Sequence, residues 1–211
     1  MFNKEKITRK SDLVNTMDSL SSYDGMTCQQ NPHCFEAFYN LIEDKKPVRI
    51  LEIGTALGGL TRFLKHACNE LNLDTDIRTY DINGRHEHGV LIKEGVDVRI
   101  ENIFESGYTD LKNREIIEFI KQDGLTIVLC DGGNKIKEFN ILSQYLKIGD
   151  IIMAHDYSYD SETFSKKINK IYWNWHEISE SDIQESIEKY NLKPYMQDEF
   201  DIAVWVCKIK E

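Results

Sequence analysis

Residues 49–60 read RILEIGTALGGL, a short apolar run that ends in an acid and a glycine and continues into two more glycines. The apolar run predicts a buried strand, and the pattern that begins at Leu60 predicts a helix directly behind it. Glycines at such a turn let a ligand approach the backbone closely. Open α/β folds bind ligands at the carboxyl ends of their parallel strands, so this turn is a candidate site for a nucleotide-like ligand.

Strand-like and helix-like segments alternate along the chain, which predicts a parallel sheet with crossover helices. We expect strands at 47–53, 76–82, 96–101, 125–130 and 150–154, and helices at 34–43, 60–71, 111–121, 136–146 and 182–190, the last capped by Ser181. Two final strands at 192–196 and 202–209, joined by five residues, predict a hairpin. The expected fold is α/β, with a doubly wound, mostly parallel seven-stranded sheet and a C-terminal antiparallel hairpin.

The length of 211 residues suits one domain with a single core. We expect a helical N-terminal segment over 1–44, a domain over 45–211, and an insertion at about 158–180, where the pattern changes. The aromatic residues Tyr157, Tyr159, Trp173 and Trp175 lie in or beside this insertion. They could form a wall for a flat or sugar-like molecule, or simply pack half-buried beneath the insertion.

The formal net charge of -10 disfavours nucleic acid as a partner, because an acidic surface repels phosphate backbones. A local basic patch would need Lys135, Lys137, Lys166, Lys167 and Lys170, which we interpret as solvated helix faces. The N-terminal MFNKEK has no apolar core, and no apolar run reaches the length of a membrane span. We therefore expect no signal peptide, no membrane partner and a cytoplasmic protein.

The five cysteines are scattered, odd in number and without paired CxxC spacing. This argues against a zinc site and against a secreted disulfide scaffold. Cys130 and Cys207 lie in apolar runs, so we expect them to be buried thiols.

Polar residues and glycines follow the first four of these strands, and the carboxyl ends of parallel strands share one edge of a sheet. An acid after the second strand can accept hydrogen bonds from both hydroxyls of a ribose, and an asparagine after the third can bond an adenine edge. The residues expected to converge are Glu52, Gly54, Gly58, Gly59, Asp81, Asn102 and Asp131.

The glycine spacing argues against a nicotinamide-dependent oxidoreductase. A dinucleotide fold needs G-x-G-x-x-G with a pyrophosphate on the helix N-terminus. Here Ala56 occupies the second glycine position, and Glu52 would repel a pyrophosphate. Glu52 instead suits a positively charged ligand, such as a sulfonium that carries an amino group.

These residues resemble the class I S-adenosylmethionine-dependent methyltransferases. The E-x-G-x-x-x-G-G turn at 52–59 is similar to the first motif of that family, and Asp81 to its ribose-binding acid. Within that family, the chain is similar to the cephalosporin hydroxylase-like and sugar or macrolide O-methyltransferase branch. The resemblance covers roughly residues 27–157 and is carried by QNP at 30–32, GTALGG at 54–59, DI at 81–82 with His86, DGGN at 131–134 and HDY at 155–157.

The resemblance implies a Rossmann-like fold and S-adenosylmethionine as the cofactor. It places the cofactor against Gln30, Glu52, Gly54, Thr55, Gly58, Gly59, Asp81, Ile82, Asn102, Ile103 and Asp131. In that branch, acids after the fourth and fifth strands commonly hold a divalent metal. Asp131, Asp156 and His155 would be the ligands here, and this mixed set suits Mg²⁺ or Mn²⁺.

Two positions depart from the pattern of that branch. Asn134 stands where a histidine or tyrosine is usual, and could add a carbonyl oxygen to the metal; His155 stands where the first acid of a pair is usual. Histidine titrates near neutral pH, so His155 is also the candidate base, with Asp131 and Asp156 as the other candidate catalytic residues.

The expected function is O-methylation of a small hydroxylated acceptor, such as a sugar or natural product, with or without a divalent metal. The departures at Asn134 and His155 also allow an S-adenosylmethionine-binding module or sensor without turnover. The N-terminal segment and the final strands could support a homo-oligomer.

Overall fold

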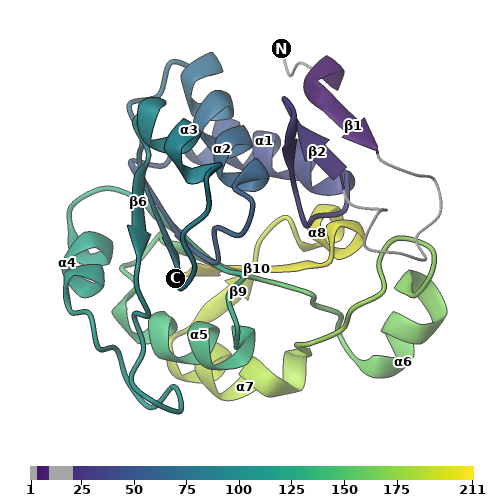
Figure 1. The fold of residues 1–211 in the computed structure, drawn as a ribbon. Helices are drawn as coiled ribbons and strands as arrows, with labels where there is room; N and C mark the ends of the chain where they lie inside the picture. Colours follow the sequence, from purple (N-terminus) through teal and green to yellow (C-terminus); the bar gives the residue numbers. More distant parts are fainter. Residues whose placement is uncertain (1–3, 10–20) are drawn as a thin grey trace.

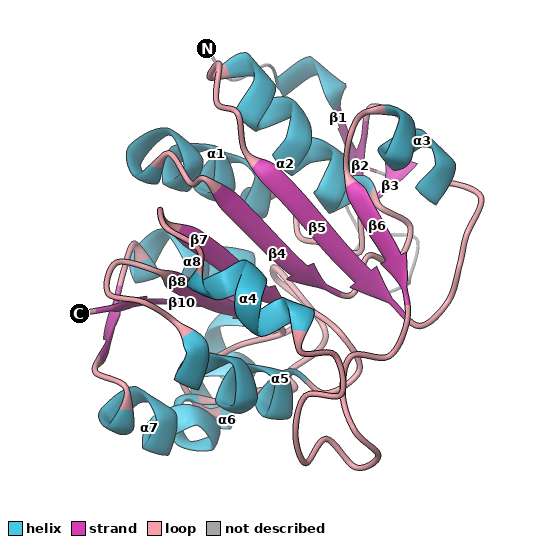
Figure 2. Ribbon diagram, turned by 90° about the vertical axis from the view of Figure 1, so that its left-hand side faces the viewer, coloured by secondary structure: helices cyan, strands magenta, loops and turns pink. Residues whose placement is uncertain are grey.

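The computed structural model describes residues 4–9 and 21–211. Its main feature is a seven-stranded sheet with the order β6-β5-β4-β7-β8-β10-β9. The first five strands in this order are parallel, and β10 runs antiparallel to both of its neighbours. This confirms the predicted fold class (Figure 2). The strands are β4 (Arg49–Ile53), β5 (Asp76–Asp81), β6 (Asp97–Ile100), β7 (Thr126–Cys130), β8 (Ile151–His155), β9 (Leu192–Pro194) and β10 (Trp205–Lys210).

Helices cover both faces of the sheet (Figure 1). One face is packed by α1 (His33–Lys45), α2 (Gly59–Glu70), α3 (His88–Lys93) and α8 (Gln197–Ala203). The other is packed by α4 (Glu115–Lys121), α5 (Lys135–Leu142) and α7 (Glu180–Lys189). The segment after β8 holds the short helix α6 (Ser161–Thr163) and a π-helical turn, Phe164–Ile168.

Alternating side chains along each strand pack against the helices on the two faces of the sheet, because successive residues of a strand point to opposite faces. In β4, Ile50 packs into the α1–α2 side, and Leu51 and Ile53 pack into the α4–α5 side. The apolar strand β7 is buried along its whole length because it lies between β4 and β8 with helices on both faces.

The N-terminal part departs from the expected helical segment. The helix expected at 34–43 is present as α1, but the residues before it form a 3-10 turn at Lys4–Lys6 and the antiparallel strands β1 (Ile7–Arg9), β2 (Ser21–Tyr23) and β3 (Met26–Thr27). Residues 1–3 and 10–20 of the expected helical segment lie outside the described residues.

The C-terminal hairpin is present, but its connection is the helix α8 and not a five-residue turn. The side chain of Gln197 fixes this helix against β10: its amide donates to the carbonyl of Trp205 and its oxygen accepts from the N–H of Cys207. Two helices also differ from the expectation. Ser179, and not Ser181, caps α7 through a capping box with Asp182. The helix α3 was not predicted.

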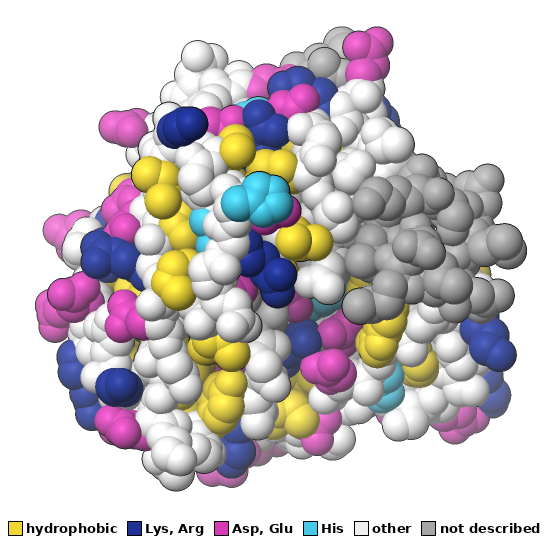
Figure 3. All heavy atoms as spheres, in the orientation of Figure 1, with side chains coloured by type: hydrophobic (Ala, Val, Ile, Leu, Met, Phe, Trp, Pro, Cys, Tyr) yellow, Lys and Arg dark blue, Asp and Glu magenta, His cyan; other side chains and the backbone are white. Residues whose placement is uncertain are grey.

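All five cysteines are buried and unbridged, as expected for Cys130 and Cys207. Across the described ranges 4–9 and 21–211, no helix combines the length and the apolar character needed to cross a membrane. On the described part of the face in Figure 3, acidic and basic side chains are interspersed. The exclusion of nucleic acid as a partner stays a prediction.

Candidate functional site

Two adjoining cavities lie at the carboxyl edge of the sheet and share the walls Gly54, Ala56, Asp131 and Gly132. The larger, of about 310 Å³, extends beside Glu52 and α2 toward residues 173–177, and we name it the Glu52 cavity. The smaller, of about 180 Å³, is lined by the ends of β5 and β6, and we name it the Asp81 cavity. The predicted convergence of four strand ends therefore produces two joined cavities.

The glycines of the turn are needed for close backbone packing. A Cβ atom on Gly54, whose φ is +98°, would lie 2.1 Å from the carbonyl oxygen of Asp131. A Cβ atom on Gly59 would lie 2.4 Å from Cys28 Sγ. Gly58, the N-cap residue of α2, has a φ of +76°, a conformation that side chains disfavour. These positions bring the strand ends together and leave the space above the turn open.

Asp81 lines the smaller cavity and binds the turn that both cavities share. Its Oδ2 accepts a hydrogen bond of 2.8 Å from the N–H of Ala56, and its Oδ1 accepts one of 2.8 Å from the N–H of Asn83. Each oxygen keeps a second lone pair for a ligand hydroxyl. On the other side of the turn, His88 Nε2 lies 2.9 Å from the carbonyl oxygen of Ala56, so α3 also fixes the turn. Sequence reasoning did not find this role of His88.

The remaining predicted residues of the Asp81 cavity are also placed there. Asn102 and Ile103 line it, and Asn102 Oδ1 accepts from the N–H of Phe104 at 3.0 Å, which leaves its NH₂ group available. Ile82 lies at the rim and is 68% exposed. Tyr108 also lines this cavity and was not predicted.

Glu52 is a buried acid at the base of the Glu52 cavity. It accepts hydrogen bonds from the hydroxyls of Thr61 at 2.5 Å and Thr79 at 2.6 Å, and Thr55 contacts the Thr79 hydroxyl at 2.6 Å. Burial, which disfavours the charged form, raises the pKa of Glu52 to about 7. The site therefore contains a carboxyl group that titrates near neutral pH.

We expect this titration to appear in the pH dependence of stability. Between its ordinary pKa and about 7, folded Glu52 holds a proton that the unfolded chain has released. Its contribution to the free energy of unfolding is therefore full below its ordinary pKa and falls by about 3 kcal/mol as the pH rises to 7. Denaturant unfolding of Glu52→Gln at pH 5 and pH 7.5 should show a decline that is smaller by about 2 kcal/mol, because pH 5 already lies above the ordinary pKa of a glutamate. The exposed control Glu118→Gln should keep the wild-type decline, and a wild-type decline in Glu52→Gln would refute the assignment.

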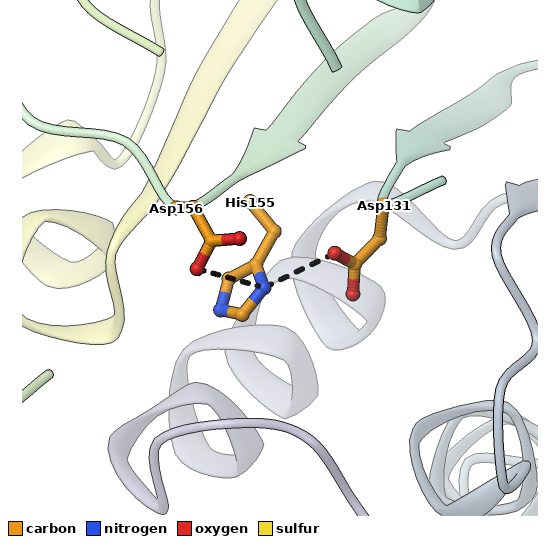
Figure 4. Close-up of side chains that lie close together, drawn as sticks. All are labelled: Asp131, His155 and Asp156. Atoms are coloured by element: carbon orange, nitrogen blue, oxygen red, sulfur yellow. Dashed lines mark hydrogen bonds and ion pairs between the residues drawn. The ribbon is translucent and has the colours of Figure 1, made fainter. Parts of the chain in front are cut away.

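Asp131, His155 and Asp156 form a cluster at the ends of the adjacent strands β7 and β8 (Figure 4). His155 Nδ1 lies 3.1 Å from Asp131 Oδ1 and 3.6 Å from Asp156 Oδ1. Burial opposes the charged imidazole, but the two carboxylates outweigh it and raise the pKa of His155. The ring stacks on Trp205 with a centroid distance of 4.9 Å, and its Nε2 is buried with no hydrogen-bond partner among the residues that the structure describes. Only the Nδ1 edge of the ring therefore faces the acids.

Gln30 holds Asp131 in place. Its Nε2 donates to Asp131 Oδ2 at 2.7 Å, and its Oε1 accepts from Trp205 Nε1 at 2.9 Å. The side chain lines the Glu52 cavity as predicted, but both ends of its amide are engaged by the protein. We therefore assign Gln30 a positioning role toward Asp131.

Lys135 is the main residue of the site that sequence reasoning missed. Its interpretation as part of a solvated helix face is wrong, because its side chain is only 8% exposed. The Nζ atom lies 3.0 Å from Asp156 Oδ2, 2.9 Å from Glu177 Oε2 and 3.7 Å from Asp131 Oδ1. The sequence did contain a signal, because Lys135 follows Asp131 by four residues and lies in the first turn of α5. Helix side chains tilt toward the N-terminus, so a lysine at this position can point back toward the acid.

The predicted metal ligands are brought together, with donor atoms of Asp131, His155 and Asp156 within 4.8 Å of one another. The ammonium of Lys135 shares this space. An Mg²⁺ ion bound to Asp156 Oδ2 at about 2.1 Å would lie within about 5 Å of Nζ. At that distance a double and a single positive charge repel by roughly 7 kcal/mol for an effective dielectric constant near 20. With Lys135 in this position, its ammonium takes up the space between the acids, and the residues as placed offer no open site to a divalent ion.

The other candidates divide between the site and the packing around it. Asn134 caps α5 by accepting from the N–H of Lys137 at 3.1 Å. Trp173 and Trp175 line the Glu52 cavity, and Trp173 Nε1 donates to Asp156 Oδ1 at 2.5 Å. Tyr159 is 63% exposed, and Tyr157 is buried and donates to Glu180 at 2.8 Å. Two of the four aromatic residues therefore form a cavity wall.

No family model and no curated protein sequence matches the chain. Solved structures do match its fold. CmcI in its apo form aligns with a TM-score of 0.59 and 10% identity over 90% of this chain and 76% of CmcI. CmcI with Mg and SAM aligns with a TM-score of 0.56 and 13% identity over 94% of this chain and 78% of CmcI. An O-methyltransferase family protein from Burkholderia thailandensis aligns with a TM-score of 0.54 and 9% identity, over 84% of this chain and 55% of that one. The chain therefore shares its fold with CmcI and with this O-methyltransferase family protein.

Proposed function

We propose that the protein is an S-adenosylmethionine-dependent methyltransferase that O-methylates a small hydroxylated acceptor, such as a sugar or natural product. One observation carries the proposal: the carboxylate of Asp81 lies 2.8 Å from the N–H of Ala56, directly on the glycine turn that separates two joined cavities. The fold likeness to CmcI with Mg and SAM supports the same ligand.

The two cavities divide the donor between them. The Asp81 cavity would take the adenosine, with the ribose hydroxyls on the free lone pairs of Asp81 and the adenine between Asn102 and Ile103. The Glu52 cavity would take the methionine part, whose amino group and sulfonium are cationic. An ionised Glu52 at the base of that cavity favours such a cation.

Methyl transfer is an in-line displacement that depends mainly on holding the two reactants in position. A lone pair of the acceptor oxygen forms the new O–C bond, and the C–S bond breaks with its electron pair left on sulfur. The hydroxyl proton passes to the Asp131–His155 pair, whose Oδ1 and Nδ1 atoms are 3.1 Å apart. Trp173 and Trp175 form the wall on the acceptor side.

Calorimetric titration with S-adenosylhomocysteine tests the donor site. We expect saturable binding by the wild type and at least a tenfold weaker affinity for Asp81→Ala, because two ribose hydroxyls lose a charged acceptor. Asp74→Ala, an exposed acid that precedes the same strand, is the matched control and should bind like the wild type. Absence of binding by the wild type, or equal affinity in Asp81→Ala, would contradict the proposal.

A binding module without turnover is the second candidate. It is favoured by the engagement of each acid in the cluster with protein partners and by the buried Nε2 of His155. Release of S-adenosylhomocysteine from S-adenosylmethionine across a panel of sugars and hydroxylated natural products separates the two. Turnover with any acceptor excludes the module, and donor binding without turnover across the panel favours it.

A further inference from the structure

The cluster of acids at the ends of β7 and β8 has its own internal cation. Lys135 places its ammonium within 3.0 Å of Asp156 and Glu177 and within 3.7 Å of Asp131, and Gly132 contributes a carbonyl oxygen at 3.4 Å. Buried acids that stay ionised are stabilised by a nearby positive charge. The side chains of Lys135 and Asp156 are 8% and 9% exposed, so this charge is supplied from within the fold.

The ammonium occupies the position that a metal ion would need. It contacts an oxygen of Asp156 and approaches Asp131, and these two acids are also the hard oxygen donors of the predicted metal set. Lys135 is the first residue of α5, and the Asn134 cap fixes the start of this helix. The helix end therefore holds the ammonium in place. Removal of this charge would leave three acids and His155 around a vacated position.

We propose that the ammonium of Lys135 takes the place of a divalent cation in this site, so that the acceptor oxygen is bound and its developing negative charge stabilised without a metal ion. This inference rests on the proposed function.

Glu177 is the partner that an acceptor could replace. Its side chain is 50% exposed, whereas the other acid within 3.0 Å of Nζ, Asp156, is buried. Glu177 also lines the Glu52 cavity beside Trp175. A hydroxyl oxygen of the acceptor that displaces Glu177 would accept a hydrogen bond from one N–H of Lys135. This hydrogen bond stabilises the acceptor oxygen while the hydroxyl proton moves to the Asp131–His155 pair and an oxygen lone pair attacks the methyl carbon.

Binding of Mn²⁺ alone tests this inference without an acceptor. We would titrate Mn²⁺ into the wild type, Lys135→Ala and Lys135→Gln and follow the signal of free Mn²⁺ by electron paramagnetic resonance. We expect no saturable binding by the wild type at up to about millimolar Mn²⁺, and at least tenfold tighter, stoichiometric binding by Lys135→Ala, since its three acids regain an open position. Lys137→Ala, an exposed lysine on the same helix, is the matched control and should behave like the wild type.

Stoichiometric Mn²⁺ binding by the wild type would overturn the inference, and so would the absence of increased binding in folded Lys135 variants. If neither Lys135 variant folds, Mn²⁺ binding is compared between the wild type and Asp156→Asn. Binding by the wild type that Asp156→Asn abolishes would overturn the inference. Absence of binding by both proteins would support it. Where an acceptor is turned over, EDTA should leave the rate unchanged within twofold, and a metal-dependent rate would overturn it.

Failure of this inference differs from failure of the proposed function. Titration with S-adenosylhomocysteine in EDTA reports on the donor site alone. Donor binding together with wild-type Mn²⁺ binding would refute the internal cation and keep the methyltransferase. Absence of donor binding would refute the methyltransferase whatever the Mn²⁺ result.

Discussion

Replacement of Gly54 with alanine is expected to abolish S-adenosylhomocysteine binding and to lower the free energy of unfolding by about 4 kcal/mol. The added Cβ atom would lie 2.1 Å from the carbonyl oxygen of Asp131 and 2.9 Å from the N–H nitrogen of Gly132, and the backbone has a φ of +98°. Both contacts are with backbone atoms, so β4 and β7 must separate at their carboxyl ends. That separation deforms the wall that the two cavities share.

Gly89→Ala is the matched control for this prediction. Gly89 lies in α3, and a Cβ atom there would meet no atom of the described residues within 4 Å. Its stability should change by no more than about 1 kcal/mol, in the stabilising direction, because alanine favours the helix. Denaturant unfolding and calorimetric titration measure both variants. Wild-type binding and stability in Gly54→Ala would show that the turn is not constrained in this way.

Asp131→Asn is expected to lower the rate of methyl transfer at least 100-fold. The substitution keeps the shape of the side chain but removes the charge that faces Nδ1 of His155 and the ammonium of Lys135. The pKa of His155 should fall as well, because Asp131 is one of the two carboxylates that raise it. Steady-state kinetics with an acceptor that the wild type methylates measure the rate, and NMR titration of His155 measures the pKa without any acceptor.

The exposed Asp123→Asn is the control and should change neither the rate nor the titration of His155. An unchanged pKa of His155 in Asp131→Asn would show that the 3.1 Å contact is not an ionic one in solution. An unchanged rate would remove Asp131 from the proton-transfer step.

The sheet and the donor side of the site were predictable because their signals are local. The strand-like segments that lead to Glu52, Asp81 and Asp131 mark parallel strands, and parallel strands place their ends at one edge regardless of the rest of the fold. Residues 127–130 of β7 are all apolar, which is typical of a strand covered on both faces, and β7 lies between β4 and β8.

The parts that sequence reasoning missed depend on contacts between distant segments. Nothing in the sequence around Lys135 shows that Glu177, 42 residues later, will fold over it. Gln30 was placed at the site, but its hydrogen bonds to Asp131 and Trp205 span 101 and 175 residues. The helix α8 also depends on distant packing, since Phe200 contacts Phe38 of α1 with a ring-centroid distance of 5.2 Å.

The crystal structure of the protein with S-adenosylhomocysteine tests the central claim most directly. We predict one ligand that spans both cavities, with its ribose hydroxyls on Asp81, its adenine beside Asn102 and its amino acid part above Glu52. A ligand bound elsewhere, or one whose ribose does not contact Asp81, would contradict the account.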